Sequence, residues 1–178
     1  MSTLYFLRHA TAEVILPDQD DRARCLIEKG KQQAAKVGQF MVRHDISPQR
    51  VFTSPYPRAS ETAAIVCEQA KLTSAKEVDW LALNTPPRHA LEALQYLIPH
   101  LPAHSLFVGH EPDLSQLISL IVSAQSPLRE PLLKVRKASL TCLQLNTTLT
   151  GCVTPSIGSN DPAAVNGLIQ WSVPVKFM

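Results

Sequence analysis

Short apolar segments that alternate with stretches of helical periodicity most constrain the fold of this chain. Residues 4–7 form a continuous apolar run, which is typical of a strand covered on both faces. Residues 50–53 and 105–108 predict two further strands, and residues 77–81 are a possible additional one. Helical patterns fill the intervals and span residues 28–44, 58–70, 87–98 and 112–123. This alternation predicts a mainly parallel sheet with helices on both faces.

The C-terminal part of the chain has a different pattern. Asp161 is the only charged residue in the sequence from 138 to 175. Residues 138–145 alternate with period two, and residues 167–173 also predict a strand. We expect both to extend the same sheet, with one or more antiparallel edge strands. Residues 146–165 are expected to form a polar loop or a wide hairpin. The predicted fold is therefore an α/β three-layer sandwich.

Length and charge narrow the class of protein. The 178 residues fit a single domain, residues 1–178, and the sequence shows neither a repeat nor a long linker. The formal net charge is +2, from 17 Lys and Arg against 15 Asp and Glu, which argues against a protein that wraps nucleic acid. Polar residues interrupt the weakly charged C-terminal part, so we expect no membrane span, which needs about 20 apolar residues.

The cysteines and the N-terminus favour a cytoplasmic protein. Cys25, Cys67, Cys142 and Cys152 form no Cys-x-x-Cys pair, and we expect reduced, mostly buried thiols. A secreted protein with two disulfides is the alternative. The first nine residues lack the basic start and the long apolar run of a signal peptide. The six histidines show no ligand spacing with the cysteines, so no metal site is predicted.

Three predicted strands end in residues suited to bind an oxyanion. The first ends in Arg8 and His9, the second leads through a turn to Arg58, and another ends just before His110. Because ligands of open α/β sheets bind beyond the carboxyl ends of the strands, we expect these side chains to meet at one edge. Arginine forks match phosphate oxygens, and imidazoles can donate a proton or attack. A helix starting at Pro112 would add backbone N–H groups.

Each of these residues has an ordinary structural explanation when taken alone. His110 could be a solvated residue at a strand end, and Arg58 could lie on the surface of a helix. Arg8 and His9 directly after a buried strand are harder to explain in this way, because two groups that can carry positive charge need a partner there. The four residues together therefore predict a phosphate site.

At this point the motifs resemble a known family. Residues 7–11, 54–63 and 108–112 are similar to the three signature motifs of the histidine phosphatase superfamily, which has the phosphoglycerate-mutase-like fold. The short length resembles the compact SixA-type phosphohistidine phosphatases in particular. Residues 137–139 and 171–174 also look similar to that branch, so the resemblance covers nearly the whole chain.

Two positions depart from the family pattern. Ala10 stands where the family usually has Gly. Its methyl group would restrict how closely the backbone can approach a phosphate. Residues 24–30 are similar to a family segment that more often begins Arg-Pro-Leu-Thr. The resemblance makes Arg24, together with Thr11 of the first motif, a possible contact for phosphate or substrate.

The resemblance implies covalent catalysis. Neutral His9 would attack phosphorus and become phosphohistidine, and water would then release the phosphate. Arg8, Arg58 and His110 would neutralise the three equatorial oxygens. His9 needs one unprotonated ring nitrogen, with the other held by an acceptor, for which we expect a backbone carbonyl. No metal or cofactor is expected, because the arginines supply the positive charge.

The proton donor for the leaving group is left open by the sequence. Larger members of the superfamily place a glutamate after the third strand, but residues 80–85 contain none. Glu111 follows the second histidine and is a possible donor, although it could equally be a carboxylate that faces the start of a helix. Asp18 and Glu13 could also reach the site, or could simply be solvated. The lack of a strong proton donor fits phosphohistidine as the substrate. Imidazole is a good leaving group, because its conjugate acid has a pKa of about 6.5.

The resulting expectation is a phosphohistidine protein phosphatase, similar to SixA-type enzymes. About 50 residues separate Arg58 from Gly109, which leaves no room for a large lid. An open pocket suits a phosphorylated protein, such as a histidine phosphotransfer domain. The alternatives are a phosphomonoesterase or mutase that acts on a small phosphorylated molecule, and a non-catalytic phosphate-binding module.

Overall fold

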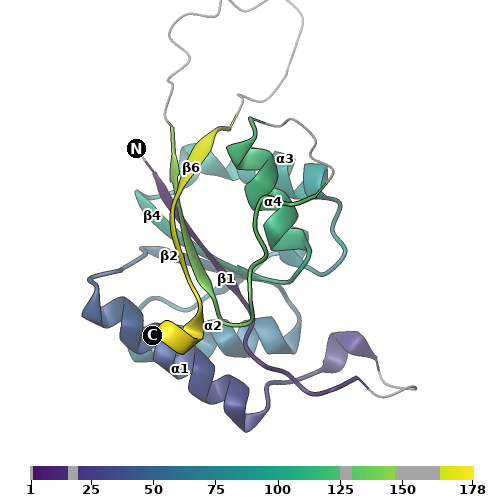
Figure 1. The fold of residues 1–178 in the computed structure, drawn as a ribbon, viewed down its shortest axis with the longest axis vertical. Coiled ribbons are helices and arrows are strands. Elements are labelled where there is room, and N and C mark those ends of the chain that lie inside the picture. Colours follow the sequence, from purple (N-terminus) through teal and green to yellow (C-terminus); the bar gives the residue numbers. More distant parts are fainter. Residues whose placement is uncertain (1, 16–19, 125–129, 147–164) are drawn as a thin grey trace, which may run out of the picture.

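The computed structural model describes residues 2–15, 20–124, 130–146 and 165–178, which contain one six-stranded sheet with helices packed against it (Figure 1). The strands are β1 (Thr3–Arg8), β2 (Arg50–Thr53), β3 (Lys76–Glu77), β4 (His104–Gly109), β5 (Leu140–Leu145) and β6 (Gly167–Val173). The α-helices are α1 (Glu28–Arg43), α2 (Pro57–Ala70), α3 (Pro87–Leu97) and α4 (Asp113–Val122). Short 3-10 helices are η1 (Asp21–Ala23), η2 (Asp79–Leu81), η3 (Ile98–His100) and η4 (Val175–Phe177).

The strand order is β3-β2-β4-β1-β5-β6. The pairs β2–β3, β2–β4 and β1–β4 are parallel, whereas β5 pairs antiparallel with both β1 and β6. This arrangement confirms the expectation of a mainly parallel sheet with antiparallel strands at one edge. In the described residues, no helix is both long enough and apolar enough to cross a membrane.

Strand β1 lies inside the sheet and separates two apolar cores. Tyr5 and Leu7 face the core that α1 and α2 cover, and Leu4 and Phe6 face the core that α3 and α4 cover. Side chains alternate across a strand, so a run of four apolar residues is what a strand covered on both faces requires. The structure therefore confirms the three-layer sandwich.

The possible strand over residues 77–81 is largely wrong. Only Lys76 and Glu77 pair with β2, and the chain then turns into η2. The reason is the core between α3, α4 and the sheet, where Leu81 is buried and the Trp80 ring lies 5.7 Å from that of Phe107. A turn places these apolar side chains under the sheet, whereas a continued edge strand would not. The expected loop of residues 146–165 lies mostly outside the described residues.

The segment after β1 is held against α1 by a close backbone contact at Gly30. A Cβ at this position would overlap the carbonyl oxygen of Thr11. That same carbonyl accepts a hydrogen bond from the Ile27 amide at 3.2 Å. Gln33 of α1 accepts hydrogen bonds from the amide and the hydroxyl of Thr11 at 3.0 and 2.8 Å. These contacts determine where the chain runs as it leaves the end of β1.

We expect Gly30→Ala to destabilise the protein although alanine favours helices. Alanine gains about 1 kcal/mol of helix propensity over glycine. Overpacking against rigid backbone costs about 1–3 kcal/mol, and we expect this cost to exceed the gain. Chemical denaturation should show a lower free energy of unfolding. Lys31→Ala, at the next and exposed position of α1, is the control and should change it by no more than about 0.5 kcal/mol. A Gly30→Ala protein as stable as wild type would contradict the close contact.

Candidate functional site

The ends of β1, β2 and β4 meet at one edge of the sheet. Arg8 is in register with Gly109, and Thr53 is in register with Val108, so the residues that follow the three strands lie side by side. They enclose a cavity of about 380 Å³. The residues that line it are Arg8, His9, Asp21, Arg24, Arg58, Leu83, His110, Glu111 and Lys137. The structure thus brings together all four residues that the sequence placed at this edge.

His9 is buried, with 6% of its surface exposed, and has a defined hydrogen-bonding state. Its Nδ1 lies 2.7 Å from the carbonyl oxygen of Ala10. Because a carbonyl only accepts, Nδ1 carries the proton and Nε2 keeps its lone pair. Burial lowers the pKa of His9 to about 3, and the positive charges of Arg58 and Arg8 add to this effect. The imidazole is therefore neutral near pH 7 and can act as a nucleophile through Nε2.

His110 lies beside His9, and the two rings have centroids 5.2 Å apart. Only 1% of His110 is exposed, and its Nε2 lies 2.7 Å from the hydroxyl of Ser54. Burial lowers the pKa of His110 to about 2, with contributions from His9 and from the arginines. The Ser54 hydroxyl can either donate to Nε2 or accept from it; when it donates, the single proton of the neutral ring lies on Nδ1, which is then an N–H donor.

The two arginines use their terminal nitrogens to bind protein oxygens. Arg58 is 1% exposed, and its Nη1 and Nη2 donate to the carbonyl oxygen and the carboxylate of Asp21 at 2.5 and 2.9 Å. Arg8 donates from Nη1 to the carbonyl oxygen of Val135 at 3.0 Å. Within the described residues, the Nε atoms of both arginines and Nδ1 of His110 are buried without a hydrogen-bond partner.

These three unpartnered nitrogens are the main chemical feature of the cavity. Each buried polar group without a hydrogen bond costs about 1–3 kcal/mol, and folded proteins keep few of them. All three belong to residues that line the cavity, as His9 does. A phosphoryl group has three equatorial oxygens that accept such hydrogen bonds. The arrangement can bind an oxyanion next to a neutral imidazole.

Arg24 and Thr11 differ in where the structure places them. Arg24 lines the cavity, donates from Nε to Asp21 at 2.8 Å and donates from Nη1 to the carbonyl oxygen of Glu13 at 2.7 Å. The Thr11 side chain bonds to Gln33 and is not among the residues that line the cavity. The first motif therefore contributes Arg8 and His9 to the cavity, while Thr11 attaches the chain to α1.

Of the expected proton donors, Glu111 lines the cavity. Its Oε1 accepts a hydrogen bond from the Ser115 hydroxyl at 2.5 Å, and its Oε2 is buried without a partner among the described residues. Glu13 is exposed, and its carboxylate accepts from the amide of Cys25 at 3.1 Å. Asp18 lies outside the described residues.

Sequence reasoning missed three residues of the cavity wall, Asp21, Leu83 and Lys137. Asp21 lies in an acidic stretch that resembles a solvated loop, and no spacing rule marks it. Lys137 reaches the site because the following Ala138, with φ of 52°, donates its amide to the carbonyl oxygen of Arg8 at 3.1 Å. That contact joins segments far apart in the sequence, and the resemblance of residues 137–139 to the SixA-type branch is the sequence signal that could have found Lys137.

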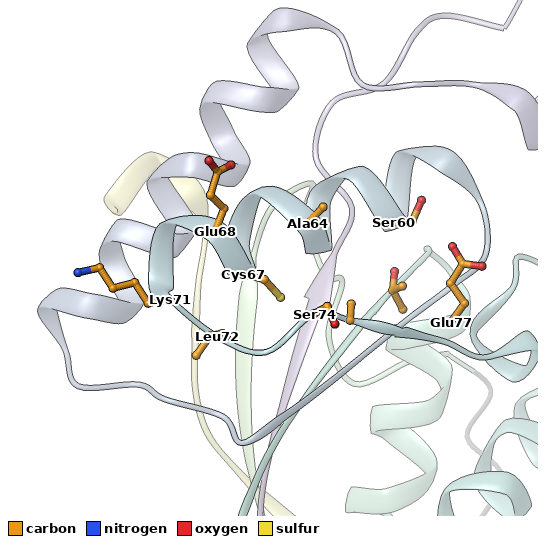
Figure 2. Close-up of a pocket in the computed structure, with 10 residues that line it drawn as sticks. Ser60, Ala64, Cys67, Glu68, Lys71, Leu72, Ser74 and Glu77 are labelled. Atoms are coloured by element: carbon orange, nitrogen blue, oxygen red, sulfur yellow. The ribbon is translucent and has the colours of Figure 1, made fainter.

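A second cavity has a larger volume but different chemistry. Figure 2 shows this space of about 630 Å³ beside α2 and the β3 edge, with Cys67 extending from α2 toward the segment that carries Ser74. No arginine or histidine lines it. Burial raises the pKa of Cys67 to about 11, so the thiol is protonated and a poor nucleophile. The described residues also contain no cluster of side chains that could hold a metal.

Comparisons with known proteins agree with this geometry. A sequence profile of the histidine phosphatase superfamily (branch 1) matches residues 4–82. A protein named phosphohistidine phosphatase SixA homolog, from Haemophilus influenzae, is 29% identical over 133 residues, which cover 70% of this chain and 80% of that protein.

Two solved structures show the same fold. The protein histidine phosphatase SixA, complexed with tungstate, has a TM-score of 0.76 at 19% identity over 98% of both chains. A mycobacterial glucosyl-3-phosphoglycerate phosphatase, complexed with VO3, has a TM-score of 0.73 at 14% identity over 96% of this chain and 98% of that one. The motifs and the fold of this chain are thus similar to those of the histidine phosphatase superfamily, and to SixA-type phosphatases in particular.

Proposed function

We propose that this protein hydrolyses phosphohistidine on other proteins, with His9 as the nucleophile. The observation that carries the proposal is the neutral His9 imidazole, which keeps its Nε2 lone pair and lines a cavity together with three residues whose buried nitrogens have no partner in the described part of the chain. A histidine phosphotransfer domain is the kind of phosphorylated protein that we expect as substrate. The names of two SixA relatives, a phosphohistidine phosphatase and a protein histidine phosphatase, support this choice.

The reaction proceeds in two displacements. Nε2 of His9 forms a bond to phosphorus while the bond from phosphorus to the substrate imidazole breaks, and the leaving nitrogen takes the electron pair and a proton from solvent or from a nearby acid. Water then attacks the phosphohistidine, its proton is lost to solvent or to a nearby base, and phosphate and neutral His9 result. Charge on the equatorial oxygens is stabilised by Nε of Arg8, Nε of Arg58 and Nδ1 of His110.

The weak acid chemistry of the cavity supports phosphohistidine over an alkyl phosphate. Two acidic side chains, Asp21 and Glu111, line the cavity. Asp21 forms ion pairs with Arg58 and Arg24, so Glu111 is the one that could donate a proton. Imidazole leaves with a conjugate-acid pKa of about 6.5, so little acid assistance is needed. An alkoxide is a far more basic leaving group and requires a proton donor.

A phosphomonoesterase is the second candidate, and one observation favours it. Oε2 of Glu111 is buried without a partner in the described part of the chain, beside the cavity. A carboxyl group in such a place is suited to protonate a leaving alkoxide. One structural neighbour is named as a phosphatase of glucosyl-3-phosphoglycerate, a small molecule.

We expect His9→Ala to lower turnover by at least about 1000-fold on a phosphohistidine protein, on phosphoramidate and on an aryl phosphate, because the nucleophile is removed. Phosphate release would be measured for all three substrates. His89→Ala, which alters an exposed histidine of α3, is the control and should retain wild-type rates. Near-normal rates for His9→Ala would exclude His9 as nucleophile. A wild-type protein that binds vanadate but turns over none of the three would instead be a phosphate-binding module.

Glu111→Gln distinguishes the two candidate functions. For a phosphohistidine phosphatase, the variant should keep most of its rate on phosphohistidine and phosphoramidate. If Glu111 is a general acid for phosphomonoesters, the rate on an alkyl phosphate should fall by about 100-fold or more. Steady-state rates on both substrate classes, compared with wild type, decide between them. A large loss on phosphoramidate would contradict our preferred function.

The low pKa values of His9 and His110 predict the pH response of both rings. NMR signals of the two imidazoles should not titrate between pH 8 and pH 5, because their pKa values are about 3 and about 2. Free histidine, which titrates near 6.5, is the reference. The unfolded chain binds protons below about pH 6.5 while the folded protein does not, so the free energy of unfolding should fall as the pH drops toward 3.

His110→Asn isolates the contribution of one ring to this stability effect. Asparagine does not titrate, so the variant should lose less stability than wild type between pH 7 and pH 5 in chemical denaturation. A ring signal that titrates near pH 6.5, or an unchanged pH dependence in the variant, would show that the histidines are not held neutral.

A further inference from the structure

Asp21 is a charged residue of the cavity wall that the proposed reaction does not use. It lies in η1, between β1 and α1, in the segment that extends away from the sheet in Figure 1. In the part of the chain that the structure describes, its carboxylate forms ion pairs with both Arg58 and Arg24, at 2.9 and 2.6 Å. A single carboxylate thus joins two of the arginines that line the cavity.

The bond to Arg58 is geometrically specific. Both terminal nitrogens of Arg58 donate to Asp21, one to its carbonyl oxygen and one to Oδ2. The Arg58 guanidinium also lies over the ring of Tyr56, 5.3 Å from its centroid. The two bonds to Asp21 use two of the five N–H donors of the guanidinium, and the buried Nε is among the three that remain.

Arg58 needs such a partner because it is buried. Only 1% of its surface is exposed, and a buried cation without a counter-charge is costly. Burial acts to raise the pKa of Asp21, but hydrogen bonds and charge from Arg24 and Arg58 outweigh it and hold that pKa below its usual value. Asp21 is therefore ionised near pH 7.

Asp21 itself is held in place from the other side. Asp20 caps η1 by accepting the Arg22 amide at 2.9 Å, and Arg24 reaches across to the Glu13 carbonyl oxygen. The segment that carries Asp21 is thereby attached to the chain that follows β1. Small errors in the placement of a group that binds the reacting phosphoryl can cost about 100-fold in rate.

We propose that Asp21 is a positioning residue, which fixes the terminal nitrogens of Arg58 so that its Nε–H is directed to the phosphoryl group. This inference rests on the proposed function and adds a residue that acts through Arg58. Asp21 does not touch the substrate in this role. Its removal lowers the rate because Arg58 loses its fixed orientation, although the net positive charge of the cavity increases.

The test compares Asp21→Ala and Asp21→Asn with Asp20→Ala, which removes the neighbouring carboxylate from the η1 cap. Steady-state kcat and KM on phosphoramidate, the inhibition constant of inorganic phosphate and the melting temperature would be measured for each. We expect Asp21→Ala to lose about 10- to 100-fold in kcat/KM and to bind phosphate more weakly. Asp21→Asn keeps an acceptor oxygen and should recover most of the rate, and Asp20→Ala, which removes a cap of η1 but neither ion pair of Asp21, should lose much less than Asp21→Ala.

A double-mutant cycle shows whether Asp21 acts through Arg58. In an Arg58→Ala background, Asp21→Ala should cause no further loss, because the group that it positions is already absent. If the losses of Asp21→Ala and Arg58→Ala add in the double variant, the proposal is overturned. A wild-type rate in Asp21→Ala alone would also overturn it. Equal losses in Asp20→Ala and Asp21→Ala would also overturn it, because they would point to disruption of η1.

An alternative role for Asp21 is to repel the phosphoryl group by its negative charge. This role predicts the opposite change in phosphate affinity, so the same measurements distinguish the two. If Asp21 mainly repels the phosphoryl group, Asp21→Ala binds inorganic phosphate more tightly than wild type, and that result overturns the proposal. Failure of the proposed function is a separate outcome, because it requires that wild type itself has no activity on phosphoramidate or a phosphohistidine protein. Weaker phosphate binding by Asp21→Ala would support the positioning role even then.

Discussion

The parallel pairing of β1 with β4 inside the sheet is the constraint on which the site depends. It sets Arg8 in register with Gly109, and the amide of His9 then donates to the carbonyl oxygen of Gly109 at 3.0 Å. His9 and His110 are consequently neighbours at the carboxyl ends of two adjacent strands. Since both strands are buried in the sheet, this relation is held by the cores on both faces rather than by surface contacts.

Burial of basic groups gives the cavity its chemical character. Arginines stay charged even when buried, whereas an imidazole that is buried beside them gives up its proton. The result is a site with positive charge from arginine and a neutral His9, which is the combination that nucleophilic attack on a phosphoryl dianion requires. The carboxylate of Asp21 is the counter-charge that allows Arg58 to lie so deep.

Much of the site could be predicted from local patterns, because strand ends and motifs are local features. Arg8, His9, Arg58 and His110 follow directly from three strand ends that parallel pairing must bring together. The motif makes Thr11 a possible phosphate or substrate contact, but its hydroxyl bonds to Gln33. The pattern of residues 77–81 is that of a possible strand, because local apolar character does not distinguish a strand from a turn that inserts into a core.

The sequence by itself determined the fold class and the four residues at the sheet edge, since both depend on hydrophobic periodicity and on short-range motifs. Only the tertiary structure decided the protonation of His9, the role of Asp21 as partner of Arg58 and the presence of Lys137 in the cavity. Burial and charge–charge contact depend on which distant segments pack together. Neither quantity is encoded within any one stretch of the chain.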